Sequence, residues 1–281
     1  MQSGRRPSAY AQKKAIISKI FVLFGLLILA IIGNAAYSTY HENKNVNARI
    51  SQELDAKLEI VSSIQSQEVE KLAIISETVR EQNQKFADFL DYDKLEPITT
   101  MLKTIAHLHA IDMVFLFDED DNLLATNRLG TAIENASRYK TVIGAPDERV
   151  GIERIAADIV KAQLSEHDFS FDGEHLLCFK SVIHLFHDTG EICGNIVLVK
   201  LINANQALAD QMARIAKANV VFYNEAGRAV LTSFGFPQVP YPSDRIIAVG
   251  KGSYIARLKN INDSSGETIG RLAVALDRQP F

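Results

Sequence analysis

One stretch of this sequence holds several side chains that could bind an anion. It belongs to a segment of residues 128–164, called the excursion below, which separates two groups of predicted strands. A guanidinium binds a carboxylate through two parallel hydrogen bonds, so converging arginines would suit a carboxylate or another small anion. Loop arginines are more often solvated, and that alternative stays open. The candidates in the excursion are Arg128, Arg138, Tyr139, Arg149 and Arg154.

A sixth candidate, Lys180, lies in a long predicted strand of residues 174–186. Alternation along a strand places Leu177 and Phe179 on one face, which we expect to pack on helices. Lys180 then points from the other face, together with Cys178. The pattern predicts a single cation on the side of the strand that faces the excursion.

Metal binding is the second chemistry that the sequence suggests, through the histidines His167, His175, His184 and His187. If one strand includes both His184 and His187, their odd spacing places them on opposite faces, which disfavours joint ligation. The acidic run Asp118–Asp121 lacks the later Gly and Glu that a calcium loop requires. We therefore expect ordinary histidines, a solvated turn, no metal site and no cofactor.

The two cysteines, Cys178 and Cys193, raise the question of a disulfide. If the strand turns back near Asp188, Cys193 lies opposite about His184, which is roughly 20 Å along the strand from Cys178. A disulfide cannot span that distance. The spacing favours two small buried thiols.

Composition and motifs exclude other functions. The 281 residues are 47% hydrophobic and 23% charged, with a net charge of −4 and no cluster of basic residues on a helix, which disfavours nucleic-acid binding. The sequence has no phosphate-binding glycine loop, no H-E-x-x-H and no G-x-S-x-G. No nucleophile and base pair can be named, so we predict no catalytic residues.

The N-terminal segment is typical of a membrane anchor. Basic residues precede an apolar stretch, and residues 15–37 would form a helix of roughly 34 Å, enough to cross a bilayer core of ~30 Å. The positive-inside rule keeps the basic tail, residues 1–14, in the cytoplasm and exports the bulk of the chain. A cleaved signal peptide with a weak site at Gly33–Ala35 is the alternative.

A long amphipathic helix is predicted from about Asn45 to Leu90, a stretch without Pro or Gly. Apolar residues recur there at steps of three and four. At 1.5 Å per residue the helix would reach roughly 65 Å, too long for one small core. Such a helix needs a partner along its length, either a second layer of the same chain or the same helix of a second subunit, and we favour a dimeric contact. The apolar positions include Ile50, Leu54, Leu58, Val61, Ile64, Leu72, Ile75, Val79 and Phe86.

Two phrases of the sequence occur twice. "FLFDEDDNLLATN" and "VFYNEAGRAVLTS" each predict a strand, a polar turn and a strand. "GEICGNIVLVKL" and "GETIGRLAVALD" each predict a strand that closes the unit, with the second glycine explained by close backbone approach. A helix precedes each hairpin, at Ile98–His109 and Asn205–Lys217. Within the first unit we also expect a helix over Gly151–Leu164 and a short strand "HDFSF", residues 167–171.

This order resembles the double Cache sensor family, in which two PAS-like sheets follow one N-terminal helix in bacterial chemoreceptors, sensor histidine kinases and diguanylate cyclases. The resemblance covers nearly the whole chain and rests on the hairpins at Phe117–Asn122 and Tyr223–Arg228 and on the Gly-x-x-x-Gly closing strands. It implies an α+β fold with a transmembrane helix, a long helix and two antiparallel five-stranded sheets. The implied parts are a tail at 1–14, a transmembrane helix at 15–37, a long extracytoplasmic helix at 45–90, a membrane-distal unit at 91–202 and a membrane-proximal unit at 203–281.

The resemblance also implies a function. The chain would be the sensor module of a receptor in the bacterial inner membrane, with its bulk periplasmic or extracellular, acting in chemotaxis or a two-component system. The family's pocket lies between sheet and excursion in the distal unit, beside Lys180, although the chain does not match the pattern of the amino-acid-binding members. A second span and an output domain are expected beyond Phe281. The alternative is a structural or protein-interaction module of the cell envelope without a pocket.

Overall fold

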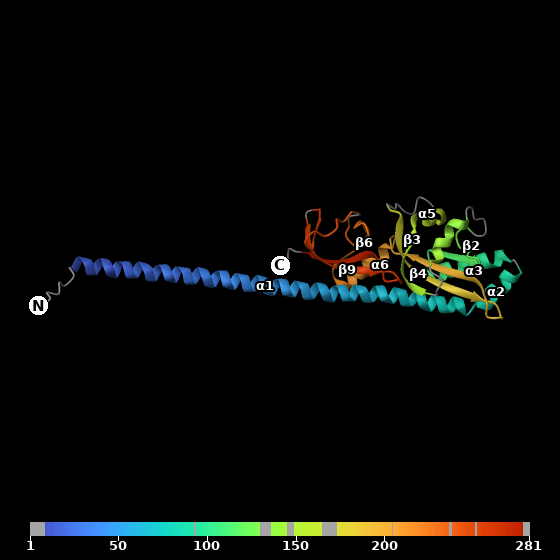
Figure 1. The fold of residues 1–281 in the computed structure, drawn as a ribbon, viewed down its shortest axis with the longest axis horizontal. Coiled ribbons are helices and arrows are strands. Elements are labelled where there is room, and N and C mark those ends of the chain that lie inside the picture. Colours follow the sequence, from blue (N-terminus) through green and yellow to red (C-terminus); the bar gives the residue numbers. More distant parts are fainter. Residues whose placement is uncertain are drawn as a thin grey trace. The chain divides into compact units, whose positions relative to one another are not determined.

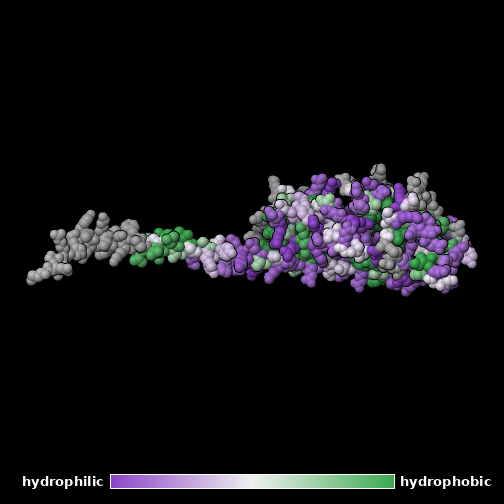
Figure 2. All heavy atoms as spheres, viewed as in Figure 1, coloured by the Kyte–Doolittle hydropathy of each residue, from purple (hydrophilic) through white to green (hydrophobic). Residues whose placement is uncertain are grey.

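The computed structural model contains two compact units, Met1–Glu53 and Leu54–Pro280. The first element is helix α1, Ala9–Arg80. From Leu23 onward α1 includes one stretch that is long and apolar enough to cross a membrane, and none of that stretch is buried. Figure 2 shows these apolar side chains gathered along the helix. The described residues are 9–92, 94–129, 136–144, 149–164, 173–203, 205–235, 238–250 and 252–277.

The unit Leu54–Pro280 contains two antiparallel five-stranded sheets with the same strand order (Figure 1). The first follows the order β2-β1-β5-β4-β3 and the second β7-β6-β10-β9-β8. The strands of the first sheet are β1 (Met113–Asp118), β2 (Leu123–Thr126), β3 (Arg149–Ala156), β4 (His175–Phe186) and β5 (Ile192–Leu201). Those of the second are β6 (Asn219–Asn224), β7 (Ala229–Thr232), β8 (Ile246–Val249), β9 (Gly252–Asn262) and β10 (Thr268–Asp277).

Helices cover the sheets and connect their strands. The helices α2 (Asn83–Asp91) and α3 (Leu95–His109) precede the first sheet, and α6 (Gln206–Ala216) precedes the second. The excursion contains a 3₁₀ turn, η1 (Ala136–Tyr139), and the short helices α4 (Lys140–Ile143) and α5 (Ala157–Gln163). Both predicted pre-hairpin helices and both hairpins are therefore confirmed.

The two repeated phrases occupy equivalent places. Both closing strands, β5 and β10, lie at the centre of their sheets, between the hairpin strand and the long neighbouring strand. A Cβ on Gly270 would lie 2.6 Å from the Tyr223 carbonyl oxygen, and one on Gly194 would overlap the carbonyl oxygen of Phe117. These contacts confirm close backbone approach as the reason for the second glycine.

Two helix predictions need correction. Residues 149–156 form the edge strand β3 instead of the start of a helix, because they pair with the free edge of the long strand β4. The spacing of Ile152 and Ile155 resembles a helical pattern, but β-branched residues also suit a half-buried strand. The long helix ends at Arg80, and the chain turns at Glu81 and Gln82 before α2 begins. The predicted strand at 167–171 lies outside the described residues.

The remaining polar predictions concern the cysteines and histidines. Both cysteines are free and buried, as expected. His184 Nδ1 lies 2.6 Å from Asn195 Oδ1, and His187 Nδ1 lies 3.4 Å from Asp91 Oδ1. Within the described ranges, no group of three His, Cys, Asp or Glu residues could hold a metal ion.

Candidate ligand-binding site

Lys180 lies at the middle of β4 and points into the core on the excursion side. Its neighbours on the same face, Cys178 and Val182, belong to the apolar cluster between sheet and excursion, so the predicted alternation is confirmed. The lysine is only 6% exposed, and its Nζ donates to the Val142 carbonyl oxygen at 3.2 Å. Gly144 has φ +75°, and a Cβ there would lie 3.3 Å from Nζ, so glycine lets the α4 backbone approach the ammonium.

Tyr139 supplies a second polar group to the same apolar cluster. Its ring is fully buried, and its hydroxyl accepts from Gln163 Nε2 at 3.2 Å and from Arg138 Nη2 at 2.9 Å. The Arg138 guanidinium lies 4.9 Å from the centre of the ring. Gln163 Oε1 is buried and has no hydrogen-bond partner among the described residues. Burying an acceptor without a hydrogen bond costs about 1 to 3 kcal/mol of free energy. A hydrogen-bond donor on a bound molecule would remove this cost.

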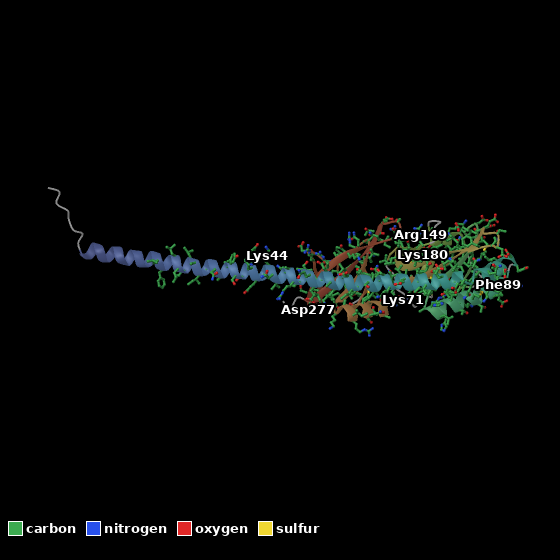
Figure 3. All side chains as sticks on the ribbon, turned by 90° about the horizontal axis from the view of Figure 1, so that it is seen from below. Lys44, Lys71, Phe89, Arg149, Lys180 and Asp277 are labelled. Atoms are coloured by element: carbon green, nitrogen blue, oxygen red, sulfur yellow. The ribbon has the colours of Figure 1, made fainter. Side chains whose placement is uncertain are left out.

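The other three arginines have partners outside the apolar cluster. Arg128 is exposed, and its Nε donates to the Asp112 carbonyl oxygen at 3.2 Å. Arg149 donates to Ser264 Oγ in the turn between β9 and β10. Figure 3 shows Arg149 and Lys180, which come from the neighbouring strands β3 and β4.

Arg154 is turned away from Lys180 by the register of the sheet. It pairs with Leu177 across β3 and β4, and Leu177 lies on the opposite face from Lys180. Its guanidinium forms ion pairs with Glu225 and, at 2.8 Å, with Glu267, both in the second half of the chain. The structure therefore places Tyr139 in the apolar cluster that Lys180 enters, with Arg138 bonded to the Tyr139 hydroxyl, whereas Arg128, Arg149 and Arg154 have other partners.

Cys178 is the thiol that lies beside Lys180 on β4. Burial raises the pKa of the Cys178 thiol to about 12, so the sulfur stays protonated and unreactive at neutral pH. Its Sγ donates weakly to the Glu153 carbonyl oxygen at 3.5 Å. What the arrangement offers is a buried cation, a tyrosine hydroxyl and a free amide oxygen inside an apolar cluster.

Sequence reasoning missed Gln163 and Gly144. Gln163 is the last residue of α5, where a polar side chain reads as ordinary helix surface. Gly144 reads as a helix end, and only the structure reveals that a lysine lies against it. The local sequence carries no signal for either contact, because both depend on how the excursion folds over β4.

Solved structures share this architecture, and two of them illustrate the likeness. The periplasmic domain of Vibrio cholerae LuxQ is 15% identical to the chain, with a TM-score of 0.56, and the match covers 81% of this chain and 100% of that domain. The sensor domain of the V. cholerae histidine kinase DctB is 11% identical, with a TM-score of 0.54, covering 81% and 96%. The fold is of the double Cache type. No family model and no curated protein sequence matches the chain.

Helix α1 of this double Cache fold is attached to the site strand through polar contacts. Ser181, next to Lys180, points to the other face of β4, where its hydroxyl lies 2.7 Å from that of Ser76 on α1. Both serines are buried. One strand therefore contacts the candidate ligand site with one residue and the helix with the next.

A charged cluster attaches α1 to the neighbouring strand β5. The Glu68 carboxylate is 6% exposed and accepts from Lys200 Nζ at 2.7 Å and from Lys71 Nζ. Burial raises the pKa of Glu68, but the hydrogen bonds from Lys200 and Lys71 outweigh it and hold the pKa below its ordinary value. The carboxylate is therefore ionised at neutral pH and fixes the helix against the sheet.

The second sheet is attached to α1 as well. Asp55 Oδ1 lies 2.9 Å from Arg257 Nε on β9, and Ser62 Oγ accepts from Lys259 Nζ at 3.0 Å. Lys57 Nζ donates to the carbonyl oxygen of Ala216 at the end of α6. Both sheets of the double Cache fold are therefore attached to the same helix, so α1 connects them.

Proposed function

We propose that this chain is the extracytoplasmic sensor module of a bacterial membrane signalling receptor and that a small ligand binds beside Lys180. The observation that carries the proposal is the buried Lys180 ammonium. An ammonium has three donors, and in the described part of the chain only the Val142 carbonyl oxygen accepts from it. The similarity of the fold to periplasmic sensor domains and the candidate span in α1 support the same conclusion.

The chemistry of the site favours a ligand with an anionic group and a hydrogen-bond donor. The anionic group would neutralise Lys180, whose charge is costly in an apolar cluster where the acceptor among the described residues is the uncharged Val142 carbonyl oxygen. The donor would satisfy Gln163 Oε1. Tyr139 and Arg138 would close the site from the excursion side.

Signalling through this module requires only differential affinity. A ligand that binds one arrangement of β4 better than another shifts the population, and the typical coupling between two sites is about 1 to 3 kcal/mol. The Ser76–Ser181 contact and the Glu68 cluster would carry the shift from the sheet to α1. The module itself needs no catalytic residue and no cofactor.

The proposed location follows from α1. The apolar stretch would anchor the chain in the inner membrane, the basic tail would remain cytoplasmic, and both sheets would lie in the periplasm or outside the cell. The first sheet would be the membrane-distal unit, residues 91–202, and the second the membrane-proximal unit, residues 203–281. A kinase, cyclase or methyl-accepting domain would receive the signal.

Ligand binding is tested on the full chain in lipid nanodiscs. Unfolding can be followed with a thiol-reactive dye, because Cys178 and Cys193 are buried in the folded state. In a screen of carboxylates, hydroxy acids and amino acids of two to six carbons, we expect at least one to raise the unfolding temperature. At a concentration of 100 Kd the stabilisation would be about 2.7 kcal/mol.

The variant Lys180→Met separates this site from general effects. We expect it to lose the ligand-induced shift, whereas Lys161→Met, an exposed lysine on α5, should keep it. A shift that survives in Lys180→Met would place the ligand elsewhere. No shift with any compound would rule out direct sensing of these ligands.

A homodimer through α1 forms part of the proposal. Ile60 and Ile74 are 40% and 62% exposed on α1, and they lie two heptads apart, so they share one face of the helix. We expect Ile60→Asp with Ile74→Asp to shift the chain from dimer to monomer in mass photometry of the nanodisc-free, detergent-solubilised protein. Ile215→Asp, which changes an exposed isoleucine on α6, serves as the matched control. A wild-type monomer would contradict the dimer.

A protein-interaction module without a pocket is the second candidate. It is favoured by the apolar cluster around Lys180, which eighteen buried residues fill, among them Phe115, Phe117 and Tyr139. The ligand screen decides between the two functions, since a module of this second kind responds to a protein partner and to no small molecule.

A further inference from the structure

A cleft lies where the two sheets meet, away from the Lys180 site. Its volume is about 340 Å³, at the small end of the range for small-molecule sites. The start of β4 forms one side and the β6–β7 turn the other, with β10 between them. At this junction, which can be followed in Figure 1, an ion pair joins Arg154 on β3 to Glu225 in the β6–β7 turn. Leu177 in the cleft lies on the opposite face of β4 from Lys180.

Contacts on one side of the cleft hold its walls in place. Arg154 on β3 forms its ion pairs with Glu225 in the β6–β7 turn and Glu267 next to β10. Close by, Glu153 Oε1 accepts from the backbone N of Ser264 at 3.2 Å. These contacts join the edge strand of the first sheet to two turns of the second, so the cleft is preformed. Its wall charges at Arg154 and Glu225 are already paired.

The rims of the cleft carry opposite charges. Glu174 is exposed on the β4 side, and Arg228 is exposed on the side of the β6–β7 turn. Within the described ranges neither side chain has a hydrogen-bond or ion-pair partner. The turn that carries Arg228 is itself fixed, since the Arg228 backbone N donates to Asn224 Oδ1 at 2.9 Å. The apolar residues of the lining include Leu177 and Ile269, which are 2% and 1% exposed, and the polar residues include His175 and Asn224.

From this arrangement we infer that the cleft is a second ligand site, which binds a small zwitterion with charged ends and an apolar middle. The ammonium end pairs with Glu174, the carboxylate end pairs with Arg228, and the methylene chain lies on Leu177 and Ile269. A molecule with one charge leaves the opposite rim unpaired and binds more weakly. Because the occupant contacts both sheets, it strengthens the junction that Arg154 already holds.

The probe for this site is 6-aminohexanoate, measured by isothermal titration calorimetry on the full chain in nanodiscs. We expect saturable binding, with hexanoate and hexylamine weaker by about tenfold or more, because each lacks one charged end. Equal binding of all three compounds, or no binding of 6-aminohexanoate, would overturn the inference.

Charge reversals give the sharper test. Glu174→Lys and Arg228→Glu should each weaken binding by about tenfold, since each leaves rims of like charge. The double variant should recover the affinity, because the zwitterion can turn round. Glu119→Lys and Arg214→Glu reverse exposed charges elsewhere and should change nothing. Single reversals without effect would contradict the site.

Lys180→Met distinguishes this site from the one under the proposed function. Binding of 6-aminohexanoate should be unchanged in Lys180→Met. If it were lost there and kept in the rim variants, the probe would occupy the Lys180 site, which would refute the cleft and support the first site. The two sites therefore succeed or fail separately.

Discussion

Replacing Gly270 with alanine is expected to destabilise the Leu54–Pro280 unit by about 3 kcal/mol, the upper range for overpacking a well-packed position. The new Cβ would lie 2.6 Å from the Tyr223 carbonyl oxygen and 3.2 Å from Leu177 Cδ1. A backbone movement that relieves the first contact would cost free energy, because β6 and β10 are paired along their length. The pairing runs from Gly270 opposite Asn224 to Ala275 opposite Asn219. Moving either backbone breaks hydrogen bonds in the middle of the second sheet.

The same change at Gly194 should have a similar effect on the first sheet. Its Cβ would overlap the Phe117 carbonyl oxygen and lie 3.5 Å from Leu90 Cδ1. Gly194 pairs with Asp118 on β1 and Leu185 on β4, so it is held from both sides. The two glycines occupy equivalent positions, which explains why the sequence repeats the phrase that contains them.

Gly151→Ala is the matched control. It also lies in a strand, but nothing lies within 4 Å of its added Cβ. Thermal unfolding with the thiol-reactive dye should show a fall of roughly 6 to 12 °C for the first two variants, since 1 kcal/mol corresponds to roughly 2 to 4 °C at this size. Gly151→Ala should stay within about 1 kcal/mol of the parent. If all three variants unfolded together, close approach would not explain the repeated glycines.

The repeat made much of the fold predictable from the sequence. Each hairpin is specified locally, by an apolar strand, a polar turn and a second strand, so its position does not depend on the rest of the chain. The turns confirm this: Asp118 Oδ1 accepts from the backbone N of Asn122, and Asn224 Oδ1 accepts from that of Arg228. Alternation along β4 likewise fixed the direction of Lys180.

The separate partners of the arginines were not predictable in the same way. Which face Arg154 occupies depends on its pairing with Leu177, and that register is set by contacts between distant strands. The strand β3 itself forms because β4 offers it an edge, although its own residues have a helical spacing. The long Arg154 side chain then pairs with the acidic groups that the fold places near it. These are Glu225 and Glu267, which come from the other half of the chain.

The second large effect is expected at Glu68, which attaches α1 to β5. Glu68→Gln should lower the free energy of unfolding by about 1 to 2 kcal/mol at pH 7. This is less than the 3 to 5 kcal/mol typical of breaking a fully buried pair, because the Lys71 side chain is 60% exposed and the Lys200 side chain 25%. Solvent screens both lysines, and water can partly replace the lost carboxylate. The loss should still exceed that of a surface pair.

The pH dependence of this effect identifies its cause. Because the folded-state pKa of Glu68 lies below the ordinary value of 4.5, its stabilisation is fully present above that pH and is lost as pH falls through the folded pKa. The stability difference between the parent chain and Glu68→Gln should therefore be constant from pH 7 to about pH 5 and shrink below it. Glu70→Gln, an exposed neighbour on α1, should show no such difference.

The same variant tests whether the cluster carries a signal. In the proposed function, a ligand at Lys180 acts on α1 through β4 and β5, and Glu68 is the charged attachment of the helix to β5. Glu68→Gln should therefore bind ligand with nearly unchanged affinity but transmit less of the effect to α1. A spin label at Ile60 on α1, compared with and without ligand, would measure this. If the label responded as fully in Glu68→Gln as in the parent, the charged cluster would stabilise the module without coupling it, and Ser76–Ser181 would remain as the path to the helix.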